Sequence, residues 1–403
     1  MDFDISKRMQ TLLAEVRQFV EEEVYPLELP FLTDGFGAVE EALNEKREDV
    51  KARGWWLPQI GKEQGGMGLS LVEHGLLTAE LGRSPLGHYV FNCQNPDSGN
   101  MTILMDRATD SQKELFLDPL LEGEVRSCFA VTEPEYAGSN PTWQGTTAVK
   151  DGGDYVINGH KWFTTGADGA VFAIVMAVTD AEAPVYERSS MFIVPTDTPG
   201  FIFEENVSTM GRQGEGWASN GELRFRDCRV PESQLLGNLG EGYAIWQERL
   251  GPARIHQCMR WIGVCERSYE LMCDYALKRE VGPGEPLAEK QFVQGWIAES
   301  RAEIDAARLL VLNTAWQTER SSAQETREQI GLIKFHVAQI LGRVIDRAVQ
   351  VHGALGLTDW TPLAHFYRTE RGARLYDGTD EVHKIAAARR LLRKYQESIG
   401  GGA

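Results

Sequence analysis

The sequence contains no long hydrophobic run. Its longest apolar stretch lies at residues 170–178, well short of the roughly 20 residues that a membrane-spanning helix needs. The N-terminus opens with the acidic sequence MDFD and lacks the apolar centre of a secretory signal peptide. We therefore expect a cytoplasmic protein without a membrane span.

Basic runs are also missing. Lysine and arginine total 41 against 59 aspartates and glutamates, which gives a formal net charge of −18. A negative surface repels phosphate groups. We therefore expect no nucleic-acid partner, and an anionic ligand would need a local positive site.

Metal-binding and common nucleotide motifs are absent as well. No two of the six cysteines have C-x-x-C spacing, and His256, His352 and His383 have no paired ligand spacing. The cysteines are typical of buried thiols in a cytosolic protein, and we predict no metal site. The chain also lacks a Rossmann G-x-G-x-x-G, a P-loop, H-E-x-x-H and G-x-S-x-G. Any nucleotide must therefore bind at another kind of site.

The hydrophobic pattern divides the 403 residues into three regions. Residues 1–123 follow a helical period, and residues 1–30 form an amphipathic helix in this interpretation. Residues 124–238 mostly alternate with period two, and residues 239–403 return to the helical period. The pattern predicts an α+β protein: a helical N-terminal domain, a central antiparallel β domain and a C-terminal helical bundle.

Turn signals and strand patterns subdivide the central region. Gly152-Gly153 and Asn158-Gly159 are turn dipeptides, and the second predicts a hairpin. Residues 170–178 and 191–195 are typical of buried strands.

Four long helices are predicted in the C-terminal region. Their helical patterns cover residues 241–279, 286–319, 326–352 and 380–396. Gly353 is expected to end the third of them.

Two polar segments of the central region could bind a heteroaromatic ligand. Residues 128–140 begin as a strand and end as a turn, with hydroxyl groups at Thr132 and Ser139. Residues 161–166 follow, and on a regular strand Trp162 and Thr164 point to one face, where they could stack on and hydrogen-bond a ring. A polar β-turn and a core tryptophan beside a cross-strand threonine are the alternatives, and composition alone favours them.

These two segments resemble the flavin-binding signatures of the acyl-CoA dehydrogenase family. Further ordered matches are residues 64–68 with 80–83, residues 229–231 with 236–237, residues 350–353 and residues 376–379. Several matches in order are far more specific than any single one. Residues 250–256, 296–301 and 377–383 are most similar to the branch that contains human family members ten and eleven.

The resemblance implies the family's architecture and cofactor. The fold would be a helical N-terminal domain, a central β domain and a C-terminal four-helix bundle, with FAD between the last two. The neighbouring subunit of a homodimer or homotetramer would supply part of the FAD site. The implied FAD contacts are Phe129, Thr132, Ser139, Trp162, Thr164, Arg279, Gln291, Gln350, Gly353, Thr379 and Glu381. The implied substrate contacts are Ser139, Arg254 and Gly378.

Some of these residues also have structural interpretations. Arg279 follows a predicted helix, whose C-terminus favours a cation in any case. Gln350 could be a surface residue, and Gly353 could serve only to end a helix.

The resemblance further implies a reaction in fatty acid metabolism. It is the dehydrogenation of an acyl-CoA thioester to a 2,3-enoyl-CoA, with electrons passed to a separate acceptor such as an electron-transfer flavoprotein. Removing the weakly acidic α-proton needs a carboxylate in a water-poor cleft. The family uses a glutamate, and the matching residue here is Asp377.

Asp377 leaves alternatives open. Some relatives carry the base on the helix after the β domain, but the matching Ala253 cannot accept a proton. Asp377 could also serve only as the N-cap of the last helix. Because nitroalkane oxidases of this superfamily also use an aspartate base, a flavin oxidase acting on a nitroalkane or an acyl-CoA is the alternative function. A non-catalytic scaffold is a third.

Overall fold

The computed structural model describes residues 4–321 and 325–400. The chain forms two compact units. We call the first the helical unit; its described residues fall within Met1–Thr33, Ala42–Phe91 and Gly251–Ala403. The second, here called the sheet unit, comprises Asp34–Glu41 and Asn92–Leu250. The N-terminal and C-terminal helical regions therefore share one unit.

The N-terminal helical run changes its helix type along its length. The hydroxyl of Ser6 caps α1 (Lys7–Phe19) by accepting a hydrogen bond from the Met9 amide at 3.3 Å. The chain then passes through a π-turn and a 3-10 turn before α2 (Glu28–Asp34). Pro26 lies in the 3-10 turn, where its missing N–H interrupts the helical ladder. The helix expected over residues 1–30 is therefore present from Lys7 onward as one helical run, but it is not α-helical throughout.

The other helices that precede the sheet are short. They are α3 (Glu40–Ala52), α4 (Leu71–Leu81), α5 (Gly87–Val90), α6 (Asp97–Arg107), α7 (Asp110–Gln112) and α8 (Asp118–Glu122). A capping box fixes the start of α4, where Ser70 and Glu73 each accept a hydrogen bond from the other's backbone amide.

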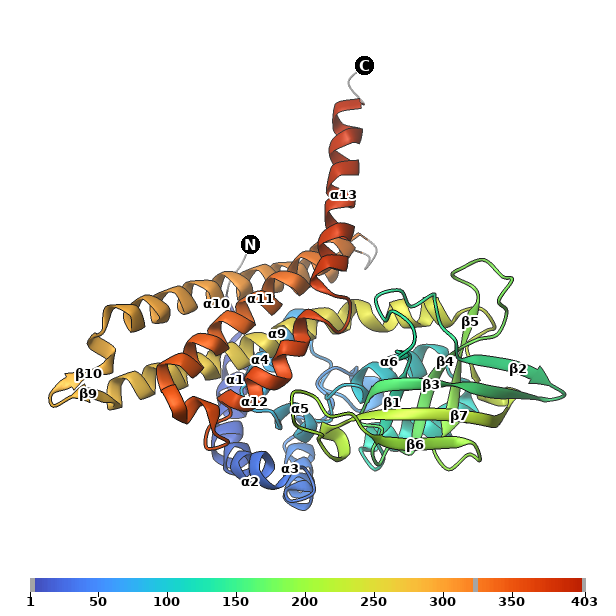
Figure 1. Ribbon diagram of the computed structural model, residues 1–403, viewed down its shortest axis with the longest axis horizontal. Helices are drawn as coiled ribbons and strands as arrows, with labels where there is room; N and C mark the ends of the chain where they lie inside the picture. The colour runs from blue at the N-terminus through green and yellow to red at the C-terminus, as the bar shows by residue number, and fades with distance from the viewer. Residues whose placement is uncertain (1–3, 322–324, 401–403) are drawn as a thin grey trace. The chain divides into compact units, whose positions relative to one another are not determined.

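The long C-terminal helices are confirmed. They are α9 (Gly242–Lys278), α10 (Gln291–Thr318), α11 (Arg327–His352) and α13 (Asp380–Gly400), with the short α12 (Leu363–Glu370) before α13. Strands β9 (Glu280–Gly282) and β10 (Glu285–Pro286) form a small hairpin between α9 and α10. Gly353 ends α11 with a φ of 60°, and α10 and α11 run side by side (Figure 1). None of the described helices combines the length and apolar character of a membrane span.

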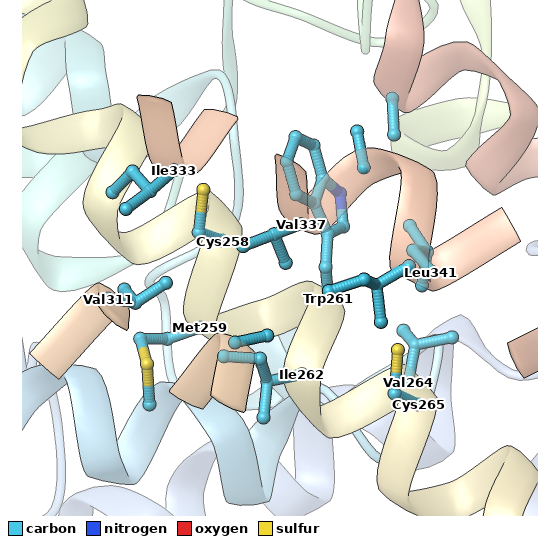
Figure 2. Packing of buried hydrophobic residues seen from close by; sticks show 14 of the residues in the cluster. Cys258, Met259, Trp261, Ile262, Val264, Cys265, Val311, Ile333, Val337 and Leu341 are labelled. Carbon is cyan, nitrogen blue, oxygen red and sulfur yellow. The ribbon is translucent and has the colours of Figure 1, made fainter. Parts of the chain in front are cut away.

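The core of the helical unit is built around α9. Figure 2 shows its side chains packing against residues of α10 and α11. The cluster includes Cys258, Met259, Trp261, Ile262, Cys265, Val311, Ile333, Val337 and Leu341. Five of the six cysteines are buried and all six are free thiols, as the sequence suggested, while Cys273 is half-buried.

The sheet unit contains one mixed sheet with the strand order β6-β7-β3-β2-β4-β5-β8, and β1 pairs with β4 off this path. The strands are β1 (Ser127–Ala130), β2 (Thr147–Asp151), β3 (Asp154–Thr165), β4 (Phe172–Val178), β5 (Ser189–Pro195), β6 (Phe201–Asn206), β7 (Asn220–Pro231) and β8 (Leu235–Leu236). The predicted buried strands are confirmed as β4 and β5. The β1–β4 and β2–β4 pairs are parallel, however, so the sheet is not antiparallel throughout.

The hairpin predicted at Asn158-Gly159 is wrong. Strand β3 runs through this dipeptide, and the turn that joins β2 to β3 lies at Gly152-Gly153 instead. Gly159 sits at a register shift in the pairing with β7. A Cβ atom there would lie 2.2 Å from Oγ1 of Thr146. Glycine is therefore required by a close approach inside the sheet and not by a turn.

We expect Gly159→Ala to destabilise the protein, because the added methyl group would displace the buried Thr146. Overpacking of this kind costs about 1–3 kcal/mol of unfolding free energy. Urea unfolding monitored by circular dichroism measures the change. Gly153→Ala is the matched control, since a Cβ atom at Gly153 meets nothing within 4 Å. Equal stability of the two variants would contradict the close-approach explanation.

Candidate active site

In the sheet unit, a buried ion pair holds the segment that follows β1. Lys161 Nζ lies 2.8 Å from Oε1 of Glu133 and donates to the Val131 carbonyl at 3.0 Å. The Glu133 carboxylate also accepts hydrogen bonds from the amides of Gly145 and Thr146, at 2.7 and 3.0 Å. Glu133 thus fixes both ends of the loop that carries Ser139.

Burial dominates the charge balance of this pair. It lowers the pKa of Lys161 to about 8, although Glu133 opposes the shift. Burial also acts to raise the pKa of Glu133, but the charge of Lys161 and the hydrogen bonds outweigh it and lower that pKa. Neither residue was singled out from the sequence. Glu133 lies 28 positions from Lys161, so no local sequence pattern links the two residues.

Trp162 and Thr164 lie beside this pair on β3. The Trp162 amide donates to the Thr132 carbonyl at 3.0 Å, so the structure brings Thr132 and Trp162 together. The register of β3 shifts between Lys161 and Thr164, and Phe163 has a φ of 49°. The regular alternation expected to place Trp162 and Thr164 on one face is therefore wrong, because a bulge interrupts the strand.

The bulge leaves two polar atoms without partners. Nε1 of Trp162 and Oγ1 of Thr164 are buried and make no hydrogen bond within residues 4–321 and 325–400. Buried polar groups are nearly always hydrogen-bonded in folded proteins. An indole donor and a hydroxyl group fit a planar ligand that carries both acceptors and donors, which is the character of an isoalloxazine ring.

The remaining predicted residues of the sheet unit differ in exposure. Phe129 is half-buried on β1, and the Arg249 guanidinium lies 4.2 Å from the centre of its ring. Arg249 also donates to the Pro96 carbonyl at 3.1 Å. Thr132 and Ser139 are exposed, so their hydroxyl groups are accessible to a ligand.

In the helical unit, Asp377 lies in a tightly held turn before α13. Asp377 and Gly378 have φ values of 54° and 94°, so both are in the left-handed region. The Asp377 carbonyl accepts a hydrogen bond from Nε of Arg254 at 3.1 Å and lies 3.0 Å from Nε2 of His383. Because a carbonyl can only accept, His383 must carry its proton on Nε2. Lys334 Nζ donates to the Gly378 carbonyl. Arg254, Asp377 and Gly378 are thus brought together.

The carboxylate of Asp377 is left free by these contacts. It is half-buried and makes no hydrogen bond or ion pair with any residue of the described ranges. The cap of α13 is Thr379, whose hydroxyl accepts the Val382 amide at 3.3 Å. The alternative that Asp377 is the helix cap is therefore wrong.

Tyr376 anchors the chain on the other side of Asp377. Its hydroxyl oxygen lies 3.0 Å from Nε2 of Gln257 and 3.1 Å from Nε1 of Trp261, which both donate to it. Arg260 contributes a longer contact of 3.4 Å to the same oxygen and pairs through two hydrogen bonds with Glu370. This network was not predicted from the sequence, because its members lie on α9, on α12 and in the turn.

The other predicted cofactor residues of the helical unit lie on separate elements. Gln350 is exposed near the end of α11, and Gly353 directly follows this helix. Thr379 and Glu381 lie at the start of α13. Arg279 and Gln291 are exposed on either side of the β9–β10 hairpin.

The chain matches three family models along its length. They are the N-terminal, middle and C-terminal domains of acyl-CoA dehydrogenase, over residues 6–124, 128–228 and 240–392. The models follow one another in the order that the resemblance implied.

Curated relatives agree with these models. Acyl-CoA dehydrogenase family member 10 of Mus musculus is 39% identical over 96% of this chain, and family member 11 of Rattus norvegicus is 36% identical over 97%. The predicted likeness to this branch is confirmed. The chain spans only 37% and 51% of the length of these two relatives. FadE2 of Mycobacterium tuberculosis is 38% identical, and the match covers 99% of both chains.

Solved structures show the same architecture. A structure from Mycobacterium abscessus superposes with a TM-score of 0.92 at 38% identity and covers 98% of this chain and 100% of its own. Butyryl-CoA dehydrogenase from Megasphaera elsdenii superposes with a TM-score of 0.83 at 28% identity, over 97% of this chain and 100% of its own. These matches confirm the predicted fold class of a helical N-terminal domain, a central β domain and a C-terminal helical domain. The chain belongs to the acyl-CoA dehydrogenase family.

Proposed function

We propose that the chain catalyses the FAD-dependent α,β-dehydrogenation of an acyl-CoA thioester, with Asp377 as the catalytic base. The observation that carries this proposal is the contrast at Asp377: its carbonyl is held by Arg254 and His383, whereas its carboxylate has no partner among the described residues. A base must be fixed in position yet keep its oxygens available for a proton.

The chemistry follows from this arrangement. The α-carbon's C–H bond breaks, the proton goes to a carboxylate oxygen of Asp377, and the electron pair forms the new double bond as a hydride leaves the β-carbon. Bound FAD supplies the acceptor of that hydride. Aspartate is one methylene shorter than glutamate, so the α-carbon must approach the main chain of the turn more closely. Ser139, Arg254 and Gly378 are the proposed substrate contacts.

The proposed FAD contacts are those that the family resemblance implies. The unpartnered polar atoms of Trp162 and Thr164 support their contact with the isoalloxazine ring. The other proposed contacts are Phe129, Thr132, Ser139, Gln350, Gly353, Thr379 and Glu381. Arg279 and Gln291 are exposed, which suits a contact with the FAD of a neighbouring subunit in a homodimer or homotetramer. The electrons would then pass to a separate acceptor, such as an electron-transfer flavoprotein.

Asp377→Asn tests the base. The amide keeps the shape of the side chain but does not accept a proton at neutral pH, so we expect FAD to remain bound while reduction by acyl-CoA slows by at least about 10²-fold. Anaerobic stopped-flow absorbance of the flavin over a panel of acyl-CoAs measures the rate. Asp346→Asn, an exposed carboxylate on α11, is the control and should reduce normally. Retained reduction in Asp377→Asn would contradict the assignment.

The same assay separates the alternative functions. Rapid formation of hydrogen peroxide when air is admitted to the reduced protein would favour an oxidase. Reduction by nitroalkanes and not by acyl-CoAs would assign that oxidase to nitroalkanes. A colourless protein that takes up no FAD would favour a scaffold.

Thr164→Val tests the flavin contact. The substitution replaces a buried hydroxyl group that has no partner by a methyl group of similar size, so the stability of the apoprotein should stay equal or rise. The affinity for FAD should fall by about tenfold, since one net hydrogen bond is lost. Fluorescence titration with FAD measures it. Thr165→Val is the control. It removes a hydroxyl group that donates to Oδ1 of Asn220 at 2.9 Å, so the affinity for FAD should not change. Unchanged FAD affinity in Thr164→Val would count against the contact.

A further inference from the structure

Two consecutive basic residues of β3 hold the segment that follows β1. Lys161 Nζ lies 2.8 Å from Oε1 of Glu133, and Nδ1 of His160 lies 2.6 Å from Oε1 of Glu135. Successive side chains of a strand point to opposite faces, and the pairing of β3 with β7 is regular at these two residues. The segment is therefore held from both faces of β3.

The two contacts differ in burial. The side chains of Lys161 and Glu133 are 0% and 2% exposed, so water does not compete with their contact. Glu135 is 55% exposed, and an ion pair with an exposed partner contributes little. The second ring nitrogen of His160 lies 2.8 Å from Oε1 of Glu222 on β7, which keeps the imidazole in place. Lys161 therefore provides the main contact and His160 a weaker second one.

The segment held in this way begins a long irregular connection. Residues 131–146, here called the β1–β2 connection, pass from β1 to β2 through turns and bends. Glu133 near its start accepts hydrogen bonds from the amides of Gly145 and Thr146 at its end. The same carboxylate binds Lys161, so both ends of the connection and β3 meet at one point.

Stability alone does not explain the buried pair. A buried strand position normally holds an apolar side chain, and replacing a buried ion pair by apolar residues is often neutral or stabilising. The β1–β2 connection carries Thr132 and Ser139, which are exposed and are proposed FAD contacts. If the connection were flexible, it would have to become ordered when FAD binds, and such ordering lowers affinity.

We propose that Lys161 and His160 are positioning residues for FAD. They hold two acidic residues of the β1–β2 connection and so order it before the cofactor binds, and neither needs to touch FAD itself. The inference rests on the proposed function, because that function assigns Thr132 and Ser139 to FAD.

The double variant Glu133→Leu/Lys161→Met tests the main contact. It removes both buried charges together, so no uncompensated charge remains and the melting temperature should change little. The amides of Gly145 and Thr146 lose their acceptor, so hydrogen exchange in the β1–β2 connection should become faster. The dissociation constant for FAD should rise by at least about tenfold, because binding must then order the connection.

His160→Leu tests the second contact. Because Glu135 is exposed, we expect a smaller rise in the FAD dissociation constant, of about two- to fivefold. His160→Arg keeps a cation for Glu135 and should restore the original affinity. The control is Lys150→Gln/Glu232→Gln, which removes an exposed ion pair of 2.6 Å from the same unit and should leave FAD binding unchanged.

Three measurements on the full chain separate positioning from stability. Fluorescence titration with FAD gives the dissociation constant, and hydrogen exchange followed by mass spectrometry, without FAD, gives the order of the β1–β2 connection. Thermal melts give the stability of each variant. A pair with only a structural role would change the melting temperature and leave the affinity of the folded protein for FAD unchanged.

Unchanged FAD affinity in Glu133→Leu/Lys161→Met would overturn the inference, whether or not hydrogen exchange becomes faster. If this double variant does not fold, the two His160 variants decide, and equal FAD affinities of His160→Leu and His160→Arg would overturn it. An original chain that takes up no FAD would refute the proposed function together with the inference. Original affinity in every variant would refute the inference alone.

Discussion

The candidate site depends on one constraint: the main chain at Asp377 and Gly378 must be held by side chains, because its own conformation is unfavourable. The two carbonyls accept hydrogen bonds from Arg254, Lys334 and His383. The residue before the turn is held as well, since the Tyr376 hydroxyl is bound by Gln257 and Trp261. Arg254, Gln257, Trp261 and Lys334 lie on α9 and α11, which pack in one core, whereas His383 lies on α13. The packing of α9 and α11 therefore defines where the Asp377 carboxylate can lie.

In the sheet unit, a buried ion pair likewise holds a segment of main chain in place. Glu133 accepts hydrogen bonds from Lys161 and from the amides of Gly145 and Thr146. A buried pair contributes little net stability when desolvation is counted, but removing one partner leaves an uncompensated charge. The pair therefore acts mainly to specify a conformation. It fixes the segment after β1 against β3 at the point where Trp162 and Thr164 keep unpartnered polar atoms.

The sequence was informative where the structural signal is local. Hydrophobic period predicted α9, α10, α11 and α13, the strands β4 and β5, and the glycine that ends α11, because each depends on neighbouring residues. The prediction failed where distant residues decide. Asn158-Gly159 has the composition of a turn, but Thr146 lies against it and keeps the strand continuous. A bulge interrupts the regular alternation of side-chain direction at Trp162, and the local sequence pattern does not reveal this bulge.

The residues of the candidate site fall into the same two groups: those that a local motif reveals and those that only contacts between distant residues reveal. The motif around Asp377 could be found from sequence because its residues are consecutive, and so could Arg254 through the resemblance. Lys334 and Glu133 could not be found, since each acts on a backbone or charged group 44 and 28 positions away. A lysine within a helical pattern is normally a surface residue, and only the three-dimensional contact shows that this one is buried.

The two sites suggest why free polar atoms and fully bonded ones occur together. A catalytic carboxylate or a ligand-binding hydroxyl must keep its hydrogen-bonding capacity for the ligand, so it cannot also hold the protein together. That task falls to neighbouring groups that are fully paired. The Asp377 carbonyl is bound while its carboxylate is free, and Lys161 is bound while the hydroxyl of Thr164, three residues later, is not. Substitutions at the paired neighbours should therefore alter the geometry of the site, whereas substitutions at the free atoms should alter chemistry or binding alone.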